Sequence, residues 1–344
     1  MRKIVGLLLM FALLVFALPF AGLLLKADTG TAPAPGSVGA LSAAGSSAAS
    51  GAVPQASVSG SELLHIYNED TKEVDEVTVR QYVIGSVASE MPSSWPDEAL
   101  KAQAVASHSY AMASKALAKA GLVTVPENAD FSARPNQRLG WANEQALRSA
   151  WGEEYADKMA RISALVDTVL DEVLMYAGQP AMACYSAISN GVTETSEVVW
   201  GTAMPYLTNV ASPYDLLAEN YEKTITMDAG QVKDCLTLSF SGMDLTGDAD
   251  TWFGSVTHTT AGGVATQRIG GVVCKGTDVR TALGLRSTTY TVQYADGSFT
   301  FTTRGYGHGV GMSQWGAKGE AENGKTYQQI LAQYYPTATL ETVQ

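Results

Sequence analysis

Apolar and polar residues alternate just after residue 60 and then change to a helical spacing. Residues Leu63 to Tyr67 alternate in this way and predict an opening strand. From Glu76 to Glu90 the apolar residues recur every four positions, a helical spacing, at Val79, Val83 and Val87. Pro92 disfavours helical geometry in the residue before it, so we expect this helix to end near Glu90 or Met91.

A second helix is predicted directly afterwards. Ser94 is its expected cap, Asp97 lies at the capping-box position and Pro96 falls in the first turn. We expect the helix to run through Lys119 and to end at Gly121, since glycine commonly terminates helices.

The rest of the chain predicts a mixture of helices and strands without an internal repeat. The expected elements are a helical stretch over 143–163, a strand or hairpin over 166–180, several short strands over 224–303 and a closing helix over 326–335. Helices and strands are partly segregated along the chain. This order indicates an α+β fold.

The N-terminus carries a long apolar run from Ile4 to Leu25, preceded by Arg2 and Lys3. About 20 apolar residues suffice for a helix to cross a bilayer, and the positive flank favours a cytoplasmic N-terminus. A cleaved secretory signal is the competing interpretation, but no small-x-small cleavage site follows the run. We expect residues 1–26 to be a single-pass membrane anchor with the remaining chain outside the cytoplasm.

Residues 27–60 consist mostly of Ala, Ser, Gly, Pro and Thr, with few large apolar side chains. Such a segment buries too little surface to offset the entropy of ordering, so it predicts a disordered linker.

The net charge of −12 argues against nucleic acid as a partner, because phosphate binding needs a basic surface. It also argues against a polyanion as a high-affinity partner and is compatible with a neutral or zwitterionic carbohydrate. The chain has three cysteines, Cys184, Cys235 and Cys274. Two of them could pair in a disulfide, and their spacings match no zinc-binding pattern. We favour the interpretation that all three cysteines are small, buried apolar residues.

Glu90 is the first candidate for chemistry. It follows Val87 on the apolar face, lies at the negative end of a helix dipole, and has Met91 and Trp95 nearby to exclude water. All these effects raise the pKa of a carboxyl group, as a general acid requires. Spacing alone favours the simpler alternative, a glutamate that reaches solvent at a helix end.

The second candidate is the helical segment that contains His108 and Tyr110. His108 shares a helix face with small apolar residues, and a histidine in such a place is more often a core residue than a catalyst. The alternative is that His108 reaches into a cleft and forms a hydrogen bond with a sugar hydroxyl. Tyr110 lies on a different face, with Gln103 and Ser114.

The third candidate is the glycine-rich segment 305–316, which also carries Tyr306, His308, Ser313 and Gln314. So much glycine indicates backbone that approaches a ligand closely, and the aromatic, amide and hydroxyl groups fit sugar recognition. A tight β-turn without a ligand is the alternative. The segment lacks the lysine of a phosphate-binding loop, and the chain shows neither a Ser/His/Asp order nor a His-Glu-x-x-His helix.

Several blocks, taken in order, resemble the stage II sporulation protein D (SpoIID-like) family. They are Val79–Pro92 with its Glu-Met-Pro, Ala99–Tyr110, Tyr185–Gly201, Tyr206–Asp215, Arg304–Gly319 and the terminal Tyr334-Tyr335-Pro336. The resemblance covers nearly everything from Leu63 onward. It implies a single curved catalytic domain over 61–344, with a substrate cleft.

The resemblance implies a lytic transglycosylase that cleaves MurNAc–GlcNAc bonds of peptidoglycan, preferring strands already stripped of stem peptides. The family's essential glutamate corresponds to Glu90, which acts as acid and then as base to give 1,6-anhydroMurNAc ends. Ring closure by the C6 hydroxyl needs no activated water, so the second carboxylate of ordinary glycosidases is not required. Candidate substrate-binding residues are His108, Tyr110, Tyr185, Ser186, Asn190, Tyr306, His308, Ser313 and Gln314.

The chain departs from the family pattern at several positions. His108 replaces the usual Arg and Ser109 a Thr, while Ser186 stands where His is frequent and Asn190 where Gly is. Some relatives bind zinc near this block, but Cys184 has no partner at close spacing, so we expect neither metal nor cofactor. A histidine at 108 makes the charge there pH-dependent.

Two other functions remain open from the sequence. One is a non-catalytic glycan-binding protein that enhances a peptidoglycan amidase. The other is an ordinary hydrolase, whose second carboxylate would be Asp97, Glu194 or Glu197. The resemblance implies a setting in engulfment during sporulation, with a cell-wall amidase and other membrane proteins as partners. A vegetative cell-wall role would use the same residues.

Overall fold

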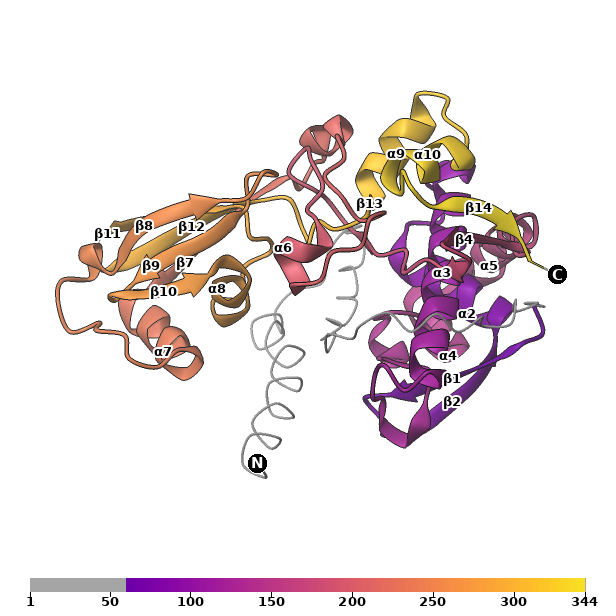
Figure 1. Cartoon of the computed structure of the whole chain (residues 1–344), viewed down its shortest axis with the longest axis horizontal. Coiled ribbons are helices and arrows are strands. Elements are labelled where there is room, and N and C mark those ends of the chain that lie inside the picture. The colour runs from indigo at the N-terminus through magenta and orange to yellow at the C-terminus, as the bar shows by residue number, and fades with distance from the viewer. Residues whose placement is uncertain (1–59, 344) are drawn as a thin grey trace. The chain divides into compact units, whose positions relative to one another are not determined.

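The computed structural model describes residues 60–343, which form two compact units (Figure 1). The larger unit comprises residues 60–221 and 306–343, and the inserted unit comprises residues 222–305. The sequence predicted one domain over this stretch, whereas the contacts separate the segment 222–305 from the rest. The predicted anchor over 1–26 and the predicted linker, except its last residue, lie outside the described residues. Between residues 60 and 343, no helix is both long and apolar enough to span a membrane.

The larger unit opens with a three-stranded sheet of order β2-β1-β3. The predicted opening strand is β1 (Leu63–Asn68), which pairs antiparallel with β2 (Val74–Thr78) and parallel with β3 (Phe131–Ala133). Leu64 and Ile66 are fully buried, as the alternation requires.

Helix α2 (Val79–Glu90) follows β2 without a loop and starts three residues later than the periodicity suggested. Thr78 and Gln81 form a capping box, which explains this start. The helix ends as predicted, because Met91 adopts an extended conformation, with φ −131, before Pro92.

Helix α3 (Asp97–Lys119) is the central helix of the larger unit (Figure 1). It contacts α2, α5 (Tyr155–Asp167), β4 (Glu172–Tyr176), α9 (Gln314–Glu322) and α10 (Tyr327–Tyr334). The prediction that Ser94 caps it was wrong, because Pro96 occupies the N-cap and no side chain caps the helix. Its predicted end is confirmed, since Gly121 follows with φ 67.

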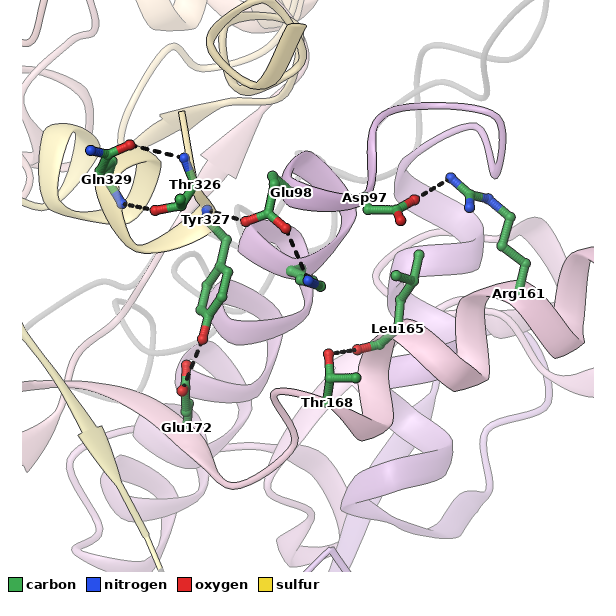
Figure 2. A network of polar contacts seen from close by, with 10 residues as sticks. Asp97, Glu98, Arg161, Leu165, Thr168, Glu172, Thr326, Tyr327 and Gln329 are labelled. Carbon is green, nitrogen blue, oxygen red and sulfur yellow. Dashed lines mark hydrogen bonds and ion pairs between the residues drawn. The ribbon is translucent and has the colours of Figure 1, made fainter. Parts of the chain in front are cut away.

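Polar contacts tie the start of α3 to its neighbours (Figure 2). The Glu98 carboxylate accepts a hydrogen bond of 2.8 Å from the backbone N–H of Tyr327, and the Tyr327 hydroxyl donates to Glu172 at 3.0 Å. Asp97 forms an ion pair of 2.7 Å with Arg161. Glu98 thus joins α3 to α10, and Asp97 joins α3 to α5. Tyr327 in turn joins α10 to β4.

The helical stretch predicted over 143–163 is two helices, α4 (Glu144–Trp151) and α5 (Tyr155–Asp167). Gly152, with φ 52, interrupts it. The strand predicted next begins later, because α5 continues to Asp167. The sheet of order β14-β4-β5 consists of β14 (Thr339–Thr342), β4 (Glu172–Tyr176) and β5 (Gln179–Pro180).

The remaining elements of the larger unit are short. They are β6 (Tyr185–Ser186), α6 (Ser196–Trp200), β13 (Met312–Ser313), α9 (Gln314–Glu322), the predicted closing helix α10 (Tyr327–Tyr334), and 3-10 turns at Pro126–Asn128, Pro135–Gln137, Gly152–Glu154 and Pro213–Leu217.

The inserted unit has its own core and two three-stranded sheets. One sheet has the order β11 (Tyr290–Ala295), β12 (Ser298–Arg304), β7 (Glu222–Asp228), and the other β10 (Val272–Lys275), β9 (Val264–Ile269), β8 (Phe253–His258). The predicted run of short strands is confirmed, but it also contains the 3-10 turn Ala249–Thr251 and the unpredicted helices α7 (Ala229–Ser239) and α8 (Gly276–Ala282). The fold is therefore a mixture of helices and sheets, as predicted.

Candidate active site

Glu90 is the last residue of α2, and its side chain is buried, with 4% exposure. The turn at Met91 and Pro92 stops the helix here and leaves the carboxylate at its C-terminal end. Its Oε2 accepts a hydrogen bond of 3.1 Å from Nε2 of Gln314, the first residue of α9. Glu90 is thus an interior carboxylate and does not reach solvent.

A row of buried polar side chains continues from this contact into the core. The amide of Gln314 also donates to Gln103 at 3.3 Å, and Gln103 donates to Ser107 at 3.0 Å. Further bonds join Ser107 to Ser86 at 2.9 Å and Ser86 to the hydroxyl of Tyr185 at 3.3 Å. The amide nitrogen of Gln314 donates to both Glu90 and Gln103, so these hydrogen bonds fix the orientation of the Gln314 side chain.

The negative charge of Glu90 affects the pKa of Tyr185, at the other end of this row. Burial is the main cause that raises the pKa of the Tyr185 phenol, and the negative charge of Glu90 raises it further. Tyr185 therefore stays protonated and acts as a neutral hydrogen-bonding group. The sequence placed Tyr185, Gln314 and Glu90 among the site residues, and the structure brings all three into one network.

The start of α9 holds Gln314 in place. Strand β13 pairs in parallel with β6, Met312 opposite Tyr185 and Ser313 opposite Ser186. The hydroxyl of Ser313 accepts the N–H of Gly316 at 3.2 Å and caps α9. Ser313 is thus a positioning residue for its neighbour Gln314.

Asp215 anchors Ser313, and sequence reasoning did not select it. Its carboxylate is fully buried and accepts hydrogen bonds from Ser313 at 2.6 Å, from the Ser189 N–H at 2.9 Å and from the Ser189 hydroxyl. Burial raises the pKa of Asp215 to about 6, although these hydrogen bonds lower it in part. Its only signal in the sequence is its place at the end of the block Tyr206–Asp215.

Arg138 is a second residue that sequence reasoning missed. It is partly buried and adopts a left-handed conformation, with φ 57, after the 3-10 turn Pro135–Gln137. Burial lowers the pKa of its guanidinium, and the negative charge of Glu90 opposes this effect. The loop packs on α2, because Ala142 donates its N–H to the carbonyl of Gly85 at 3.2 Å.

Each of the two residues in the Glu90–Gln314 contact is followed closely in sequence by a tryptophan. Trp95 comes five residues after Glu90, and Trp315 follows Gln314 directly. Their rings meet edge to face at 5.6 Å, and both are partly exposed. The ammonium of Lys318 lies 5.0 Å from the ring centre of Trp315.

His108 and Tyr110, two predicted substrate-binding residues, lie elsewhere on α3. His108 is 1% exposed, and burial lowers its pKa to about 4, against the opposing effects of the Glu172 backbone and the Asp171 charge. This ring is buried and neutral, the environment that is common for a histidine on an apolar helix face, and its role in substrate binding stays a prediction. Tyr110 packs on Phe131 at 6.2 Å.

The glycine-rich segment packs closely against residues 184–194. Tyr306 exchanges backbone hydrogen bonds with Ile188, and the N–H of Glu194 donates to Gly309 at 2.7 Å. A Cβ on Gly311, whose φ is 75, would overlap the carbonyl of Cys184. Close backbone packing within the protein therefore accounts for Gly311.

The other predicted binding residues lie along this loop. Ser186 is buried, and a Cβ on Gly307 would come within 2.9 Å of its own Cβ. Nδ1 of His308 accepts the N–H of Val310 at 3.0 Å, and its ring lies 5.1 Å from that of Trp200. Asn190 accepts a hydrogen bond of 2.7 Å from the hydroxyl of Tyr221.

Of the three carboxylates proposed for a hydrolase, Glu194 is buried beside the glycine-rich segment, and the other two have different surroundings. Asp97 forms its ion pair with Arg161, and Glu197 is exposed on α6. Within residues 60–343 no group of three His, Cys, Asp or Glu side chains is arranged to hold a metal ion, and the three cysteines there are free thiols.

Fold and site together define a protein of mixed helices and sheets whose buried carboxylate is held by an amide from a distant segment. Residues 67–176 match the family model described as SpoIID, stage II sporulation protein. The chain is 35% identical over 271 residues to stage II sporulation protein D of Bacillus subtilis and to that of Bacillus amyloliquefaciens, covering 78% of this chain and 76% of each relative. It is 28% identical over 304 residues to the amidase enhancer of Bacillus subtilis, covering 74% of this chain and 40% of that protein.

The chain belongs to the stage II sporulation protein D family. The resemblance seen in the sequence blocks is thus confirmed, and the family connects the chain with sporulation.

Proposed function

We propose that this protein is a lytic transglycosylase that cleaves the MurNAc–GlcNAc bond of peptidoglycan glycan strands, with Glu90 as its acid and base. The observation that carries the proposal is the buried Glu90 carboxylate, oriented by the amide of Gln314 at 3.1 Å. A general acid has to be held in place and shielded from water, and both conditions are met here.

One contact supports an assignment of the acidic proton to an oxygen of Glu90. An amide N–H of Gln314 points at Oε2, so Oε2 serves as an acceptor and the proton of the neutral acid belongs on Oε1. Oε1 then donates this proton to the oxygen that links C1 of MurNAc to GlcNAc. The C1–O bond breaks, and the departing GlcNAc keeps the proton as its C4 hydroxyl.

The second half of the reaction returns the proton to the enzyme. The C6 hydroxyl of the same MurNAc attacks C1, and the Glu90 carboxylate removes the hydroxyl proton as the new C6–O–C1 bridge forms. The product is a 1,6-anhydroMurNAc end, and Glu90 is again protonated. One carboxylate serves both steps because no water is activated.

Product analysis tests this function directly. Glycan strands stripped of stem peptides by an amidase are incubated with the protein and with Glu90→Gln, and the products are analysed by mass spectrometry. Anhydro-ended fragments from the parent protein and none from Glu90→Gln are expected. Fragments with reducing ends would instead identify a hydrolase that uses a second carboxylate.

A second function is favoured by the similarity to the amidase enhancer of Bacillus subtilis. In this alternative the protein binds glycan and stimulates a cell-wall amidase without cleaving the strand. Glycan binding and amidase stimulation that survive Glu90→Ala, together with no cleavage by the parent protein, would establish it.

The proposed location follows from the apolar run between Ile4 and Leu25. We propose that it tethers the chain to the cell membrane with the described units on the extracytoplasmic side, where peptidoglycan lies. A cell-wall amidase that prepares the substrate, and other membrane proteins of engulfment, are the proposed partners.

A further inference from the structure

We propose that Arg138 binds the free lactyl carboxylate of a MurNAc residue and thereby selects strands whose stem peptides have been removed. This inference rests on the proposed function and adds a specificity-determining residue to it.

The first support is the contrast between two arginines of one loop. Arg134 forms an ion pair of 2.9 Å with Glu69, and this pair holds the loop to the turn after β1. Gln137 supports the same contact, because it donates a hydrogen bond of 2.7 Å to Asp70. Arg138 differs, because its buried Nε meets no hydrogen-bond acceptor among residues 60–343. A partly buried guanidinium whose Nε lacks an acceptor is suited to an acceptor that the ligand brings.

The second support is the link between Arg138 and Glu90. The segment after Arg138 is bonded to α2 by the N–H of Ala142, which donates to the carbonyl of Gly85 at 3.2 Å, five residues before Glu90. The negative charge of Glu90 also raises the pKa of the Arg138 guanidinium, while the hydrogen bond to Oε2 comes from Gln314. Arg138 therefore lies within electrostatic reach of the acid without occupying that oxygen. A substrate group that pairs with Arg138 would belong to the sugar being cleaved or to its neighbour.

The chemistry of the substrate supplies a matching group. MurNAc carries its lactyl ether on O3 of the same ring whose C1 reacts. In intact peptidoglycan this lactyl group is an uncharged amide to the stem peptide, and removal of the peptide restores a carboxylate. Guanidinium and carboxylate pair through parallel N–H···O bonds, so Arg138 distinguishes the two states.

The overall charge of the protein favours a cation at the place where an anionic strand binds. A stripped strand carries one carboxylate per disaccharide, and the protein has a net charge of −12. The general field therefore repels the strand. A guanidinium close to Glu90 offsets this repulsion at the site where the strand must be held.

A ratio of two substrates isolates this effect. Amidase-stripped strands are compared with the same strands after chemical reduction of the lactyl carboxyl to an alcohol, which removes the charge. For the parent protein we expect kcat/KM to be roughly tenfold higher on the carboxylate strands, as one charged hydrogen-bonded pair provides. In Arg138→Gln the ratio should fall to about one, and Arg138→Lys should retain part of it.

Effects of Arg138 on Glu90 change both substrates equally and cancel in the ratio. Arg134→Gln is the matched control, because it removes a neighbouring arginine that pairs with Glu69, and its ratio should equal that of the parent. An unchanged ratio in Arg138→Gln would overturn the inference even if anhydro products form. If no strand is cleaved, the proposed function fails, and the ratio of the two dissociation constants then decides the role of Arg138.

Discussion

The side-chain amide of Gln314 donates a hydrogen bond of 3.1 Å to the carboxylate of Glu90, although 224 residues separate the two in sequence. Each residue lies at a helix end, Glu90 at the last position of α2 and Gln314 at the first of α9. The inserted unit interrupts the chain between them, so the site depends on segments that only the fold of the larger unit brings together.

The first prediction concerns this bond. Gln314→Leu keeps a side chain of similar size but leaves Glu90 without the amide donor. We expect kcat to fall at least tenfold on stripped strands, because a hydrogen bond to a charged group is worth about 1.5–3 kcal/mol. Gln103→Leu is the control, since it disturbs the row of polar groups but retains the bond to Glu90. Equal losses in both variants would refute a special role for Gln314.

Local signals in the sequence predicted the parts of the fold that depend on neighbours along the chain. The end of α2 was predictable because Pro92 acts on the residue before it, and the end of α3 because Gly121 adopts a positive φ of 67. The break at Gly152 was missed, since the apolar spacing on either side is helical and a single glycine is often tolerated inside a helix.

The site was only partly predictable for a different reason. Glu90 and Gln314 lie in blocks that resemble the family, so the sequence selected both as candidates, and the structure brings their side chains into contact. Asp215 bonds to Ser313, 98 residues later, and Arg138, which is within reach of the charge of Glu90, lies in a loop without a recognisable motif. His108 was selected because of its position in a block, and its burial depends on tertiary packing that the sequence does not show.

Asp215 predicts a dependence of stability on pH. Its pKa rises from 3.8 to about 6 in the folded protein, so the folded state holds its proton more tightly than the unfolded state. Stability from this group is therefore full below about pH 4 and decreases as the pH rises through 6. At about 1.4 kcal/mol per pH unit, the loss is at most about 3 kcal/mol.

Asp215→Asn removes this titration. The difference in unfolding free energy between the variant and the parent should shift in favour of the variant between pH 4 and pH 7, as measured by denaturant unfolding. A difference that is constant over this range would show that Asp215 does not titrate there.

His108 predicts the opposite dependence of stability on pH over nearly the same range. Its pKa falls from 6.5 to about 4, so the unfolded state binds a proton more readily than the folded state. Stability from the neutral ring is full above about pH 6.5 and is lost as the pH falls toward 4, by about 3 kcal/mol at most. His108→Leu should therefore be more resistant to acid than the parent.

The same variant separates a core role from a binding role. Because the ring is buried away from the Glu90 network, His108→Leu should keep kcat/KM on stripped strands within about twofold of the parent at pH 7. A loss of tenfold or more, with an unchanged melting temperature, would return His108 to the substrate site.

We expect the pair Trp95 and Trp315 to affect substrate binding (KM) and to leave the chemical step (kcat) nearly unchanged. Trp95 and Trp315 present partly exposed rings beside the segments that carry Glu90 and Gln314. Sugar rings stack on such surfaces, so Trp95→Ala should raise KM roughly three- to tenfold with little change in kcat. Trp95→Phe retains a ring and should recover most of the affinity. A fall in kcat at constant KM would instead indicate that Trp95 shields Glu90.

Gly316 tests how α9 delivers Gln314 to the site. A Cβ at this position would overlap the hydroxyls of Tyr334 and Ser212, which are hydrogen-bonded to each other at 2.6 Å in the core. Tyr334 is fully buried and has no room to move away, so Gly316→Ala should shift α9 and displace Gln314. We expect a loss of roughly 1–3 kcal/mol in stability, as for an overpacked core, and a fall in activity on stripped strands.

Double variants identify the cause of this loss. Tyr334→Phe and Ser212→Ala remove the two hydroxyls, so adding both to Gly316→Ala should restore part of the melting temperature and of the activity. Gly324→Ala is not a suitable control, because its φ of 86 strains any side chain. Gly230 provides a better one, since it lies in the first turn of α7 with only the Asp228 side chain near its Cβ, at 3.1 Å. If Gly316→Ala is no more destabilising than Gly230→Ala, close packing at the start of α9 does not position the amide that binds Glu90.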